Sequence, residues 1–139
     1  MKRNLLDAAG LLARLAAQQP VMATALGIHE HDGAWPDLSL AGGERLLAWL
    51  DTERARLEAV PLSDLSLDDL ADRDLALATL AALSFEQREV QPAAWDPMHA
   101  VAVVGGGLFP LISRTFGTAE SRAAALASRL HGVGDLLDA

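Results

Sequence analysis

The sequence predicts an all-α fold, an irregular bundle of about five to seven helices around a long helix at about residues 66–90. Ala and Leu, the strongest helix formers, dominate the 139 residues, whereas Tyr is absent and Ile is scarce. Strands prefer β-branched and aromatic residues, so this composition argues against a sheet. The length suffices for one hydrophobic core. We therefore expect a single helical domain over residues 1–139.

The N-terminal part is predicted to hold two helices and an ordered loop. The apolar spacing predicts a first helix from about Asn4 to Gln18. Pro20 suits a first helical turn and opens a short second helix that ends at Gly27, a left-handed cap. Residues 28–40 contain the turn-forming pair Asp32-Gly33 and Pro36, which predict a loop. The side chains expected to be buried in the first helix are Leu5, Leu12, Leu15 and Ala16.

Two longer helices are predicted next. The third covers about Ala41 to Val60, and Glu53 falls on its apolar stripe, which predicts a place at the core edge or a partner on another helix. Ser66 opens the fourth helix, with Asp69 placed for a capping box. Its segment 75–85 is apolar nearly all round, which predicts burial on most sides. The inward residues expected in the third helix are Leu46, Trp49, Leu50, Leu57 and Val60.

The C-terminal part is predicted to contain shorter helices. A connector at 91–97 precedes a short helix at 98–104, and the three glycines at 105–107 indicate a hinge or a tight helix crossing before a further segment at 108–116. Thr118 can cap a helix from Ala119 to about Leu130. Residues 133–139 resemble the opening of one more helix, which suggests the N-terminal part of a longer protein. The residues expected to face inward are Ala123, Leu126, Ala127 and Leu130.

Charge and composition exclude several classes of partner. A net charge of −8 repels phosphate backbones and anionic lipid, so neither nucleic acid nor a membrane surface is expected. The absence of cysteine fits a reducing compartment, and Asp7 and Arg14 interrupt any signal-peptide pattern, so a cytoplasmic location is expected. The apolar stretch Met98–Ile112 is too short and too broken to span a bilayer.

The segment His29-Glu30-His31-Asp32 is the main cluster of metal-ligand residue types. A zinc-peptidase motif needs His-Glu-x-x-His, and Gly33 stands where its second histidine belongs, so this motif fails. His29 and His31 are weak metal candidates, with Asp32 or the distant His99 as a further ligand. The preferred interpretation is a structured loop in which Asp32 accepts backbone hydrogen bonds and His29 packs or caps.

Other motifs favour structural roles. The glycines at 105–107 lack the Lys-Ser/Thr of a P-loop, and the acids between 64 and 74 lack EF-hand spacing but suit a helix N-terminus. Asp72, Arg73 and Asp74 are expected to form ion pairs between helices. Trp35, Trp49 and Trp95 are expected to anchor the core or an interface. No catalytic or cofactor-binding residue is predicted.

Several phrases of the sequence carry a resemblance to a known family. Residues 20–33, followed by Pro36-Asp37-Leu38-Ser39, resemble the N-terminal region of a large, mainly bacterial family known as domain of unknown function 885. Further matches are Asp72-Arg73-Asp74-Leu75, Trp95-Asp96-Pro97 and Arg129-Leu130-His131-Gly132. The resemblance rests on the order and spacing of these segments, which together span nearly the whole chain.

The resemblance implies a role within a larger protein. Family members are several times longer, and their later portion looks like a zinc-metallopeptidase fold with a His-Glu-x-x-His helix. The chain would then be a helical scaffold or channel wall of a metallopeptidase-like hydrolase, not catalytic alone. No zinc ligand maps onto it, so no cofactor is expected in this chain and zinc is expected in the parent. His29, Asp32 and Asp37 are the candidates for tying this wall to the remainder of the parent protein.

Two alternatives come from other classes. The Ala and Leu surplus and the unfinished last helix also favour a self-associating helical interaction module, whose partner is a second copy of the chain. A weaker hypothesis is a small metal-binding protein that uses His29 and His31.

Overall fold

The computed structural model describes residues 7–139, and the described part contains seven α-helices and no strand. The all-α prediction is therefore confirmed. The expected start at Asn4 and the expected burial of Leu5 lie outside the described residues. The elements are α1 (Ala8–Gln18), α2 (Pro20–Ala25), α3 (Leu40–Glu58), the 3-10 turn η1 (Leu62–Asp64), α4 (Leu67–Phe85), the π-helical turn η2 (Glu86–Val90), α5 (Pro92–Trp95), α6 (Met98–Ser113) and α7 (Ala119–Leu137).

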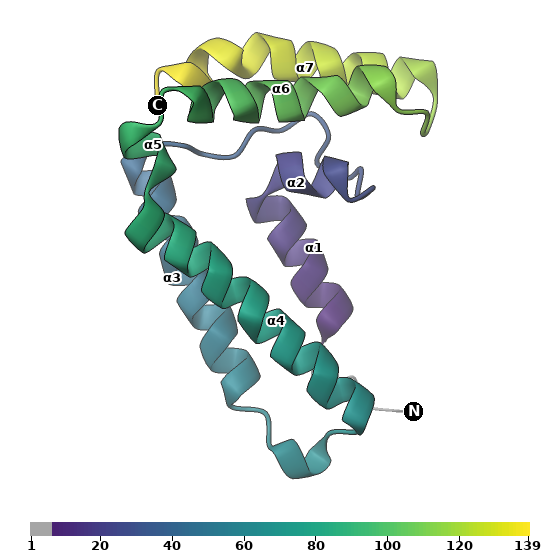
Figure 1. Ribbon diagram of the computed structural model, residues 1–139. Helices are drawn as coiled ribbons and strands as arrows, with labels where there is room; N and C mark the ends of the chain where they lie inside the picture. The colour runs from purple at the N-terminus through teal and green to yellow at the C-terminus, as the bar shows by residue number, and fades with distance from the viewer. Residues whose placement is uncertain (1–6) are drawn as a thin grey trace.

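The helices form two arms that diverge from the short helix α5 (Figure 1). In one arm α3 and α4 run side by side, with α1 next to them. In the other arm α6 and α7 form an antiparallel hairpin, and α2 and the loop before α3 lie beneath α6 (Figure 1). The loop therefore starts at α2 in the angle between the arms and follows the second arm back to the first.

The long helices begin at polar caps that the sequence predicts. Ser66 and Asp69 form a capping box, in which the Asp69 N–H donates to the Ser66 hydroxyl and the Ser66 N–H donates to the Asp69 carboxylate. Thr118 and Ser121 form a second one at the start of α7. Gly27 has φ +85°, which confirms the left-handed cap after α2.

A leucine cluster holds the first arm together. Leu11 of α1, Leu50 and Leu57 of α3, and Leu80 of α4 are buried against one another. Leu46, Trp49 and Val60 of the predicted α3 stripe are partly buried and pack around this cluster. Burial of leucine side chains removes apolar surface from water, so this cluster is the main hydrophobic contribution to the arm.

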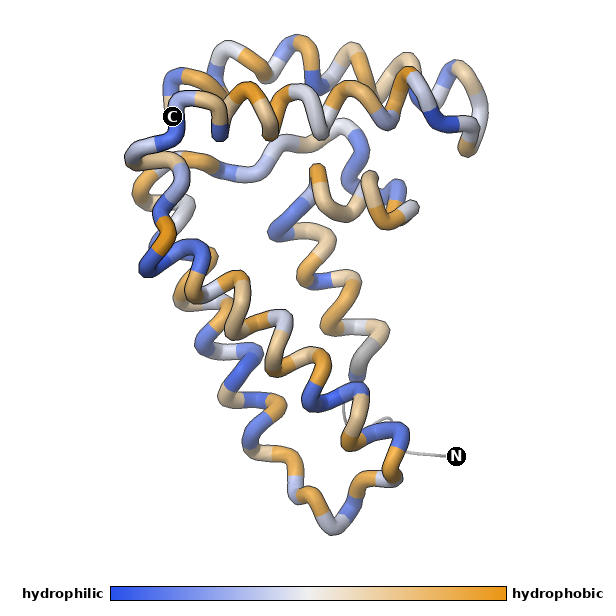
Figure 2. The backbone as a smooth tube through the Cα atoms, in the orientation of Figure 1, coloured by the Kyte–Doolittle hydropathy of each residue, from blue (hydrophilic) through white to orange (hydrophobic). Residues whose placement is uncertain are grey.

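The predicted burial of residues 75–85 on most sides was wrong. Leu80 is the buried residue of α4, whereas Leu75 is 69% exposed and Phe85 is 60% exposed. Hydrophobic residues recur along the whole of α4 (Figure 2), but α3 covers one side of the helix only. A helix that is apolar on all sides can be buried on all sides. How many of its sides are actually buried depends on how many elements pack against it. Leu12 of α1, also expected inside, is half exposed, and Leu11 takes its place.

The predicted break at the three glycines was also wrong, because α6 continues through residues 105–107 and through Pro110 to Ser113. Likewise α7 runs without interruption to Leu137, so no separate helix opens near residue 133. The buried residues of α7 are Arg129 and Leu136, whereas Ala123, Ala127 and Leu130 are exposed and Leu126 is partly buried. The predicted inward face of this helix is thus largely the outer one.

An ion-pair group joins α1 to α3. Glu53 is buried and accepts hydrogen bonds from Arg14 of α1, at 2.7 and 3.0 Å, and from Arg56, at 2.9 Å. These bonds, that from Arg14 above all, hold the pKa of Glu53 below its ordinary value. The expectation that Glu53 has a partner on another helix is confirmed.

Two leucines of α4, one buried and one exposed, give a direct test of this core. Leu80→Ala should lower the free energy of unfolding by about 2–4 kcal/mol, because it leaves a cavity among buried leucines. Leu75→Ala removes an exposed side chain of the same helix and should change it by less than about 0.5 kcal/mol. Urea unfolding followed by circular dichroism measures both, and equal losses would contradict the described packing.

Glu53 should make the stability of the protein sensitive to acid. The pKa of Glu53 in the folded state is lowered from its ordinary value of 4.5. The contribution of Glu53 to the free energy of unfolding is therefore complete above about pH 4.5 and is lost as the pH falls through the folded-state pKa. Glu53→Gln should therefore be less stable at neutral pH and lose less stability on acidification. Urea midpoints between about pH 7 and about pH 3 measure the difference. Glu58→Gln, in an exposed pair with Arg54, is the control and should follow the wild-type curve.

Candidate functional site: a buried arginine network

The strongest polar constellation surrounds Arg129 of α7, whose side chain is fully buried where α2, the following loop, α6 and α7 meet. Its Nε–H donates to the Ala34 carbonyl at 3.0 Å, and Nη1 donates to the Gly107 carbonyl at 2.5 Å. Nη2 lies 3.2 Å from the Pro20 carbonyl and 2.9 Å from the Thr24 hydroxyl oxygen. One side chain therefore binds three separate segments to α7.

The charge of Arg129 is compensated mostly by dipoles. Burial lowers the pKa of the guanidinium, and the negative charge of the nearby Asp32 opposes that effect. Removing a cation from water is expensive, so each of its N–H groups needs an acceptor at the new position. The carbonyl oxygens supply these acceptors, and the fork geometry of arginine reaches several at once.

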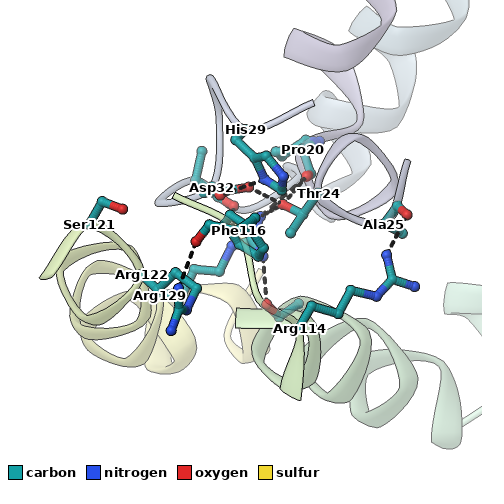
Figure 3. A network of polar contacts seen from close by, with 12 residues as sticks. Pro20, Thr24, Ala25, His29, Asp32, Arg114, Phe116, Ser121, Arg122 and Arg129 are labelled. Atoms are coloured by element: carbon teal, nitrogen blue, oxygen red, sulfur yellow. Dashed lines mark hydrogen bonds and ion pairs between the residues drawn. The ribbon is translucent and has the colours of Figure 1, made fainter. Parts of the chain in front are cut away.

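Asp32 and His29 extend this network through Thr24 (Figure 3). The hydroxyl of Thr24 donates to Asp32 Oδ1 at 2.7 Å, and His29 Nδ1 lies 2.9 Å from Asp32 Oδ2. The imidazole also stacks on the Phe116 ring, with centroids 3.7 Å apart. His29 thus packs, as expected, but the partners described for Asp32 are side chains rather than the expected backbone groups.

Trp35, in the loop before α3, contacts Arg129 through both its indole N–H and its ring. Its indole N–H donates to the Arg129 carbonyl at 2.8 Å, and the Arg129 guanidinium lies 5.4 Å from the ring centroid. A side chain at Gly107 would overlap this ring, and one at Gly132 would come within 3.0 Å of it. The last of the three glycines therefore makes room for an indole on a continuous helix, where the sequence indicated a hinge or a tight helix crossing.

Asp37 belongs to a different, local cluster at the start of α3. It accepts the Ser39 hydroxyl at 2.6 Å and the Ser39 N–H at 3.0 Å, and it pairs with Arg45. These bonds, with the Ser39 hydroxyl as the largest cause, hold the pKa of Asp37 below its ordinary value. Asp37 therefore fixes the entry into α3.

The other predicted residues lie apart from this network. Trp95 is 67% exposed and donates its indole N–H to the Val90 carbonyl at 2.7 Å, so it is not a core anchor. His31 is partly buried, and its carbonyl accepts from the Ala34 N–H within the turn. Arg73 donates to the Leu57 carbonyl of α3 and lies 3.5 Å from Asp74 on its own helix, so its interhelical contact is a hydrogen bond.

The described residues do not fit a zinc site. Within residues 7–139 no group of three or more His, Cys, Asp or Glu side chains is arranged to hold a metal ion. In the His29–Asp32 loop, His29 Nδ1 is bonded to Asp32.

A groove of about 680 Å³ lies next to the network, between α2, the start of α3, the end of α4 and α6. Its lining includes Met22, Leu38, Leu83, Gln87 and His99. The sequence did not predict this groove, because the loop before α3, η2 and α5 also line it and its walls therefore come from segments far apart in the chain.

Arg129 itself was missed by sequence reasoning, although a signal existed. The face of α7 that packs inward follows residues 122, 126, 129, 133 and 136, and an arginine lies in the middle of it. A charged residue within an apolar stripe indicates a buried polar contact.

Comparison with family models gives one match. The model for the bacterial protein of unknown function family (DUF885) matches residues 20–139. The chain belongs to this family. Comparisons with curated proteins and with solved structures found no match. In the described part of this DUF885 chain, no helix has the length and hydropathy to cross a membrane.

Removal of the arginine side chain should strongly lower the stability of this DUF885 chain. Arg129→Met removes a donor from the carbonyl oxygens of Ala34, Gly107 and Pro20 and from the buried Thr24 hydroxyl, and should lower the free energy of unfolding by about 3 kcal/mol or more. The exposed Arg114 donates a single bond to the Ala25 carbonyl, and Arg114→Met should cost less than about 1 kcal/mol. Thermal and urea unfolding measure both, and a small loss for Arg129→Met would contradict the role of the network.

The glycines of α6 should differ in their tolerance of a methyl group. Gly107→Ala collides with the Trp35 ring and should destabilise the chain by about 1–3 kcal/mol. Gly105 has no atom within 4 Å of the added methyl group, so Gly105→Ala should stabilise the helix by up to about 1 kcal/mol. Urea unfolding of the two variants gives the comparison, and the same sign for both would refute the described Trp35 contact.

Proposed function

We propose that this chain is a helical scaffold within a metallopeptidase-like member of the DUF885 family and forms one wall of a larger body. It contributes shape and contact surface, whereas zinc and the catalytic groups come from other parts of the parent polypeptide. Membership of the family supports this proposal, and the metallopeptidase character rests on the resemblance in sequence.

The observation that carries the proposal is the apolar surface of the second arm. The exposed large side chains of α6 are Met98, Val101, Phe109 and Ile112, and those of α7 are Leu130 and Leu137. Each of these residues is more than half exposed. Monomeric proteins rarely leave contiguous apolar patches of this kind in water, because covering them is favourable. A scaffold that packs against further polypeptide accounts for them.

The polar groups of the network support a structural role for the same arm. The guanidinium of Arg129 is bound by acceptors on three segments, and Asp32 is bound by Thr24 and His29. A catalytic acid or base needs access to a substrate. Here the donors and acceptors are used to fix α2 and the loop against α6 and α7.

The test uses the natural reading frame and the parent protein. Sequencing beyond codon 139 should reveal a His-Glu-x-x-His motif, and the parent should hydrolyse peptides in a zinc-dependent way that the 139-residue chain does not. Ile112→Asp, on the exposed stripe of α6, should lower the activity of the parent, while Thr115→Asp in the exposed turn after α6 should not. A reading frame without the motif, or peptide cleavage by the chain itself, would overturn the proposal.

A self-associating module is the second candidate, and α7 favours it. Ala123, Ala127, Leu130, Gly134 and Leu137 are all exposed and recur at intervals of four and three residues. Such a stripe suits the seam between two helices. Sedimentation of the 139-residue chain distinguishes the candidates, since a strict monomer with a cooperative melt would exclude this module.

A further inference from the structure

The outer side of α4 carries a continuous apolar stripe. Its members are Leu67, Ala71, Leu75, Ala78, Ala82 and Phe85, and all six are exposed. The intervals of four, four, three, four and three residues keep them within a sector of roughly 80° on the helix surface. Hereafter this set is called the α4 stripe.

The α4 stripe is distinct from the face that holds the arm together. The opposite side of the helix packs on α3 and α1 through Leu80, with Leu77 and Leu83 beside it. Leu67 and Phe85 stand at the two ends of the α4 stripe, and three alanines and Leu75 lie between them. Small side chains at a contact allow two helix axes to approach closely, so this profile suits a helix laid along α4.

Acidic residues border the α4 stripe at both ends. Asp68, Asp72 and Asp74 lie near its N-terminal half, and Glu86 and Glu89 lie at its C-terminal end; all five are exposed. The helix dipole favours acids in the first turn, but it does not favour the pair at 86 and 89 at the C-terminal end.

Among the described residues, Arg88 is an exposed cation close in sequence to this border, and it pairs with Asp51 of α3 at 2.7 Å. Arg73 is partly buried and donates to the Leu57 carbonyl, on the side of α3. The α4 stripe therefore presents an apolar band between acidic ends, with its neighbouring arginines held by α3.

We propose that the α4 stripe is the docking site for an amphipathic helix with a small apolar face and Lys or Arg flanks. This inference rests on the proposed function, and the helix belongs to the parent polypeptide outside residues 1–139. Charge complementarity selects this occupant. A second copy of α4 would place acids opposite acids in both the parallel and the antiparallel orientation, and each chain already carries a net charge of −8.

The primary experiment measures binding of two synthetic helical peptides to the 139-residue chain. One peptide has an Ala/Leu stripe flanked by lysines, and the other has glutamates in place of the lysines. Fluorescence anisotropy should show about tenfold or tighter binding of the lysine peptide, weakening as salt is added. Equal binding of the two peptides would overturn the inference.

Variants separate docking on the α4 stripe from attraction to an acidic protein. Leu75→Glu should weaken binding of the lysine peptide about tenfold, whereas Ala55→Glu on the exposed side of α3 should preserve it. The double variant Asp72→Lys, Glu86→Lys should reverse the preference toward the glutamate peptide. Unfolding curves of the free chain should be nearly unchanged for Leu75→Glu, because Leu75 is 69% exposed. Wild-type binding by Leu75→Glu would count against the site.

Two further measurements assign the occupant. The parent protein should bind the lysine peptide far more weakly than the chain alone, because its own helix covers the α4 stripe. Undiminished binding by the parent, or a dimer of the free chain that Leu75→Glu dissociates, would refute the assigned occupant. If the parent proves catalytically inactive while the peptide results hold, the proposed function fails and the docking site stands.

Discussion

The buried guanidinium of Arg129 is the constraint on which the rest of the structure depends. It lies at a junction where most of the buried neighbours are small: α6 buries Gly107, Pro110 and Leu111, and α2 buries Pro20, Ala23 and Thr24. Backbone carbonyls turned inward at such a junction need donors, and a single arginine supplies them for three segments. The second arm is thus held by polar contacts around a cation.

The two arms differ in the physics that stabilises them. The first arm relies on leucine packing, with an ion-pair group at its edge, and the second relies on hydrogen bonds to backbone oxygens. The helix pair α1 and α2 connects them, since α1 contributes Leu11 to the leucine cluster and α2 contributes Thr24 to the arginine network. A shift of α2 would therefore disturb both arms.

The sequence predicted helix caps and turns well, but it predicted poorly which side of each helix is buried. Ser66, Thr118 and Gly27 act through their immediate neighbours, so their roles follow from short-range chemistry. The buried side of α7 could not be chosen from spacing, because alanine fits either side and the decisive residue, Arg129, is charged. The need for glycine at position 107 comes from Trp35, which lies 72 positions earlier in the chain, and no local pattern predicts such a contact. Of the candidate site, the packing of His29 was foreseen, and the roles of Thr24 and Arg129 were not.

The angle between the two arms depends on the number of residues in the π-helical turn at Glu86–Val90. Each residue of a helix turns the chain by about 100°, so one residue added or removed here would swing everything that follows through more than a right angle. Arg129 follows this joint, whereas its partners Pro20, Thr24 and Ala34 precede it, so these hydrogen bonds form only when the joint has its present residue count. The relative orientation of the two arms therefore depends on the number of residues in this turn. Insertions and deletions in this segment should be far rarer than substitutions.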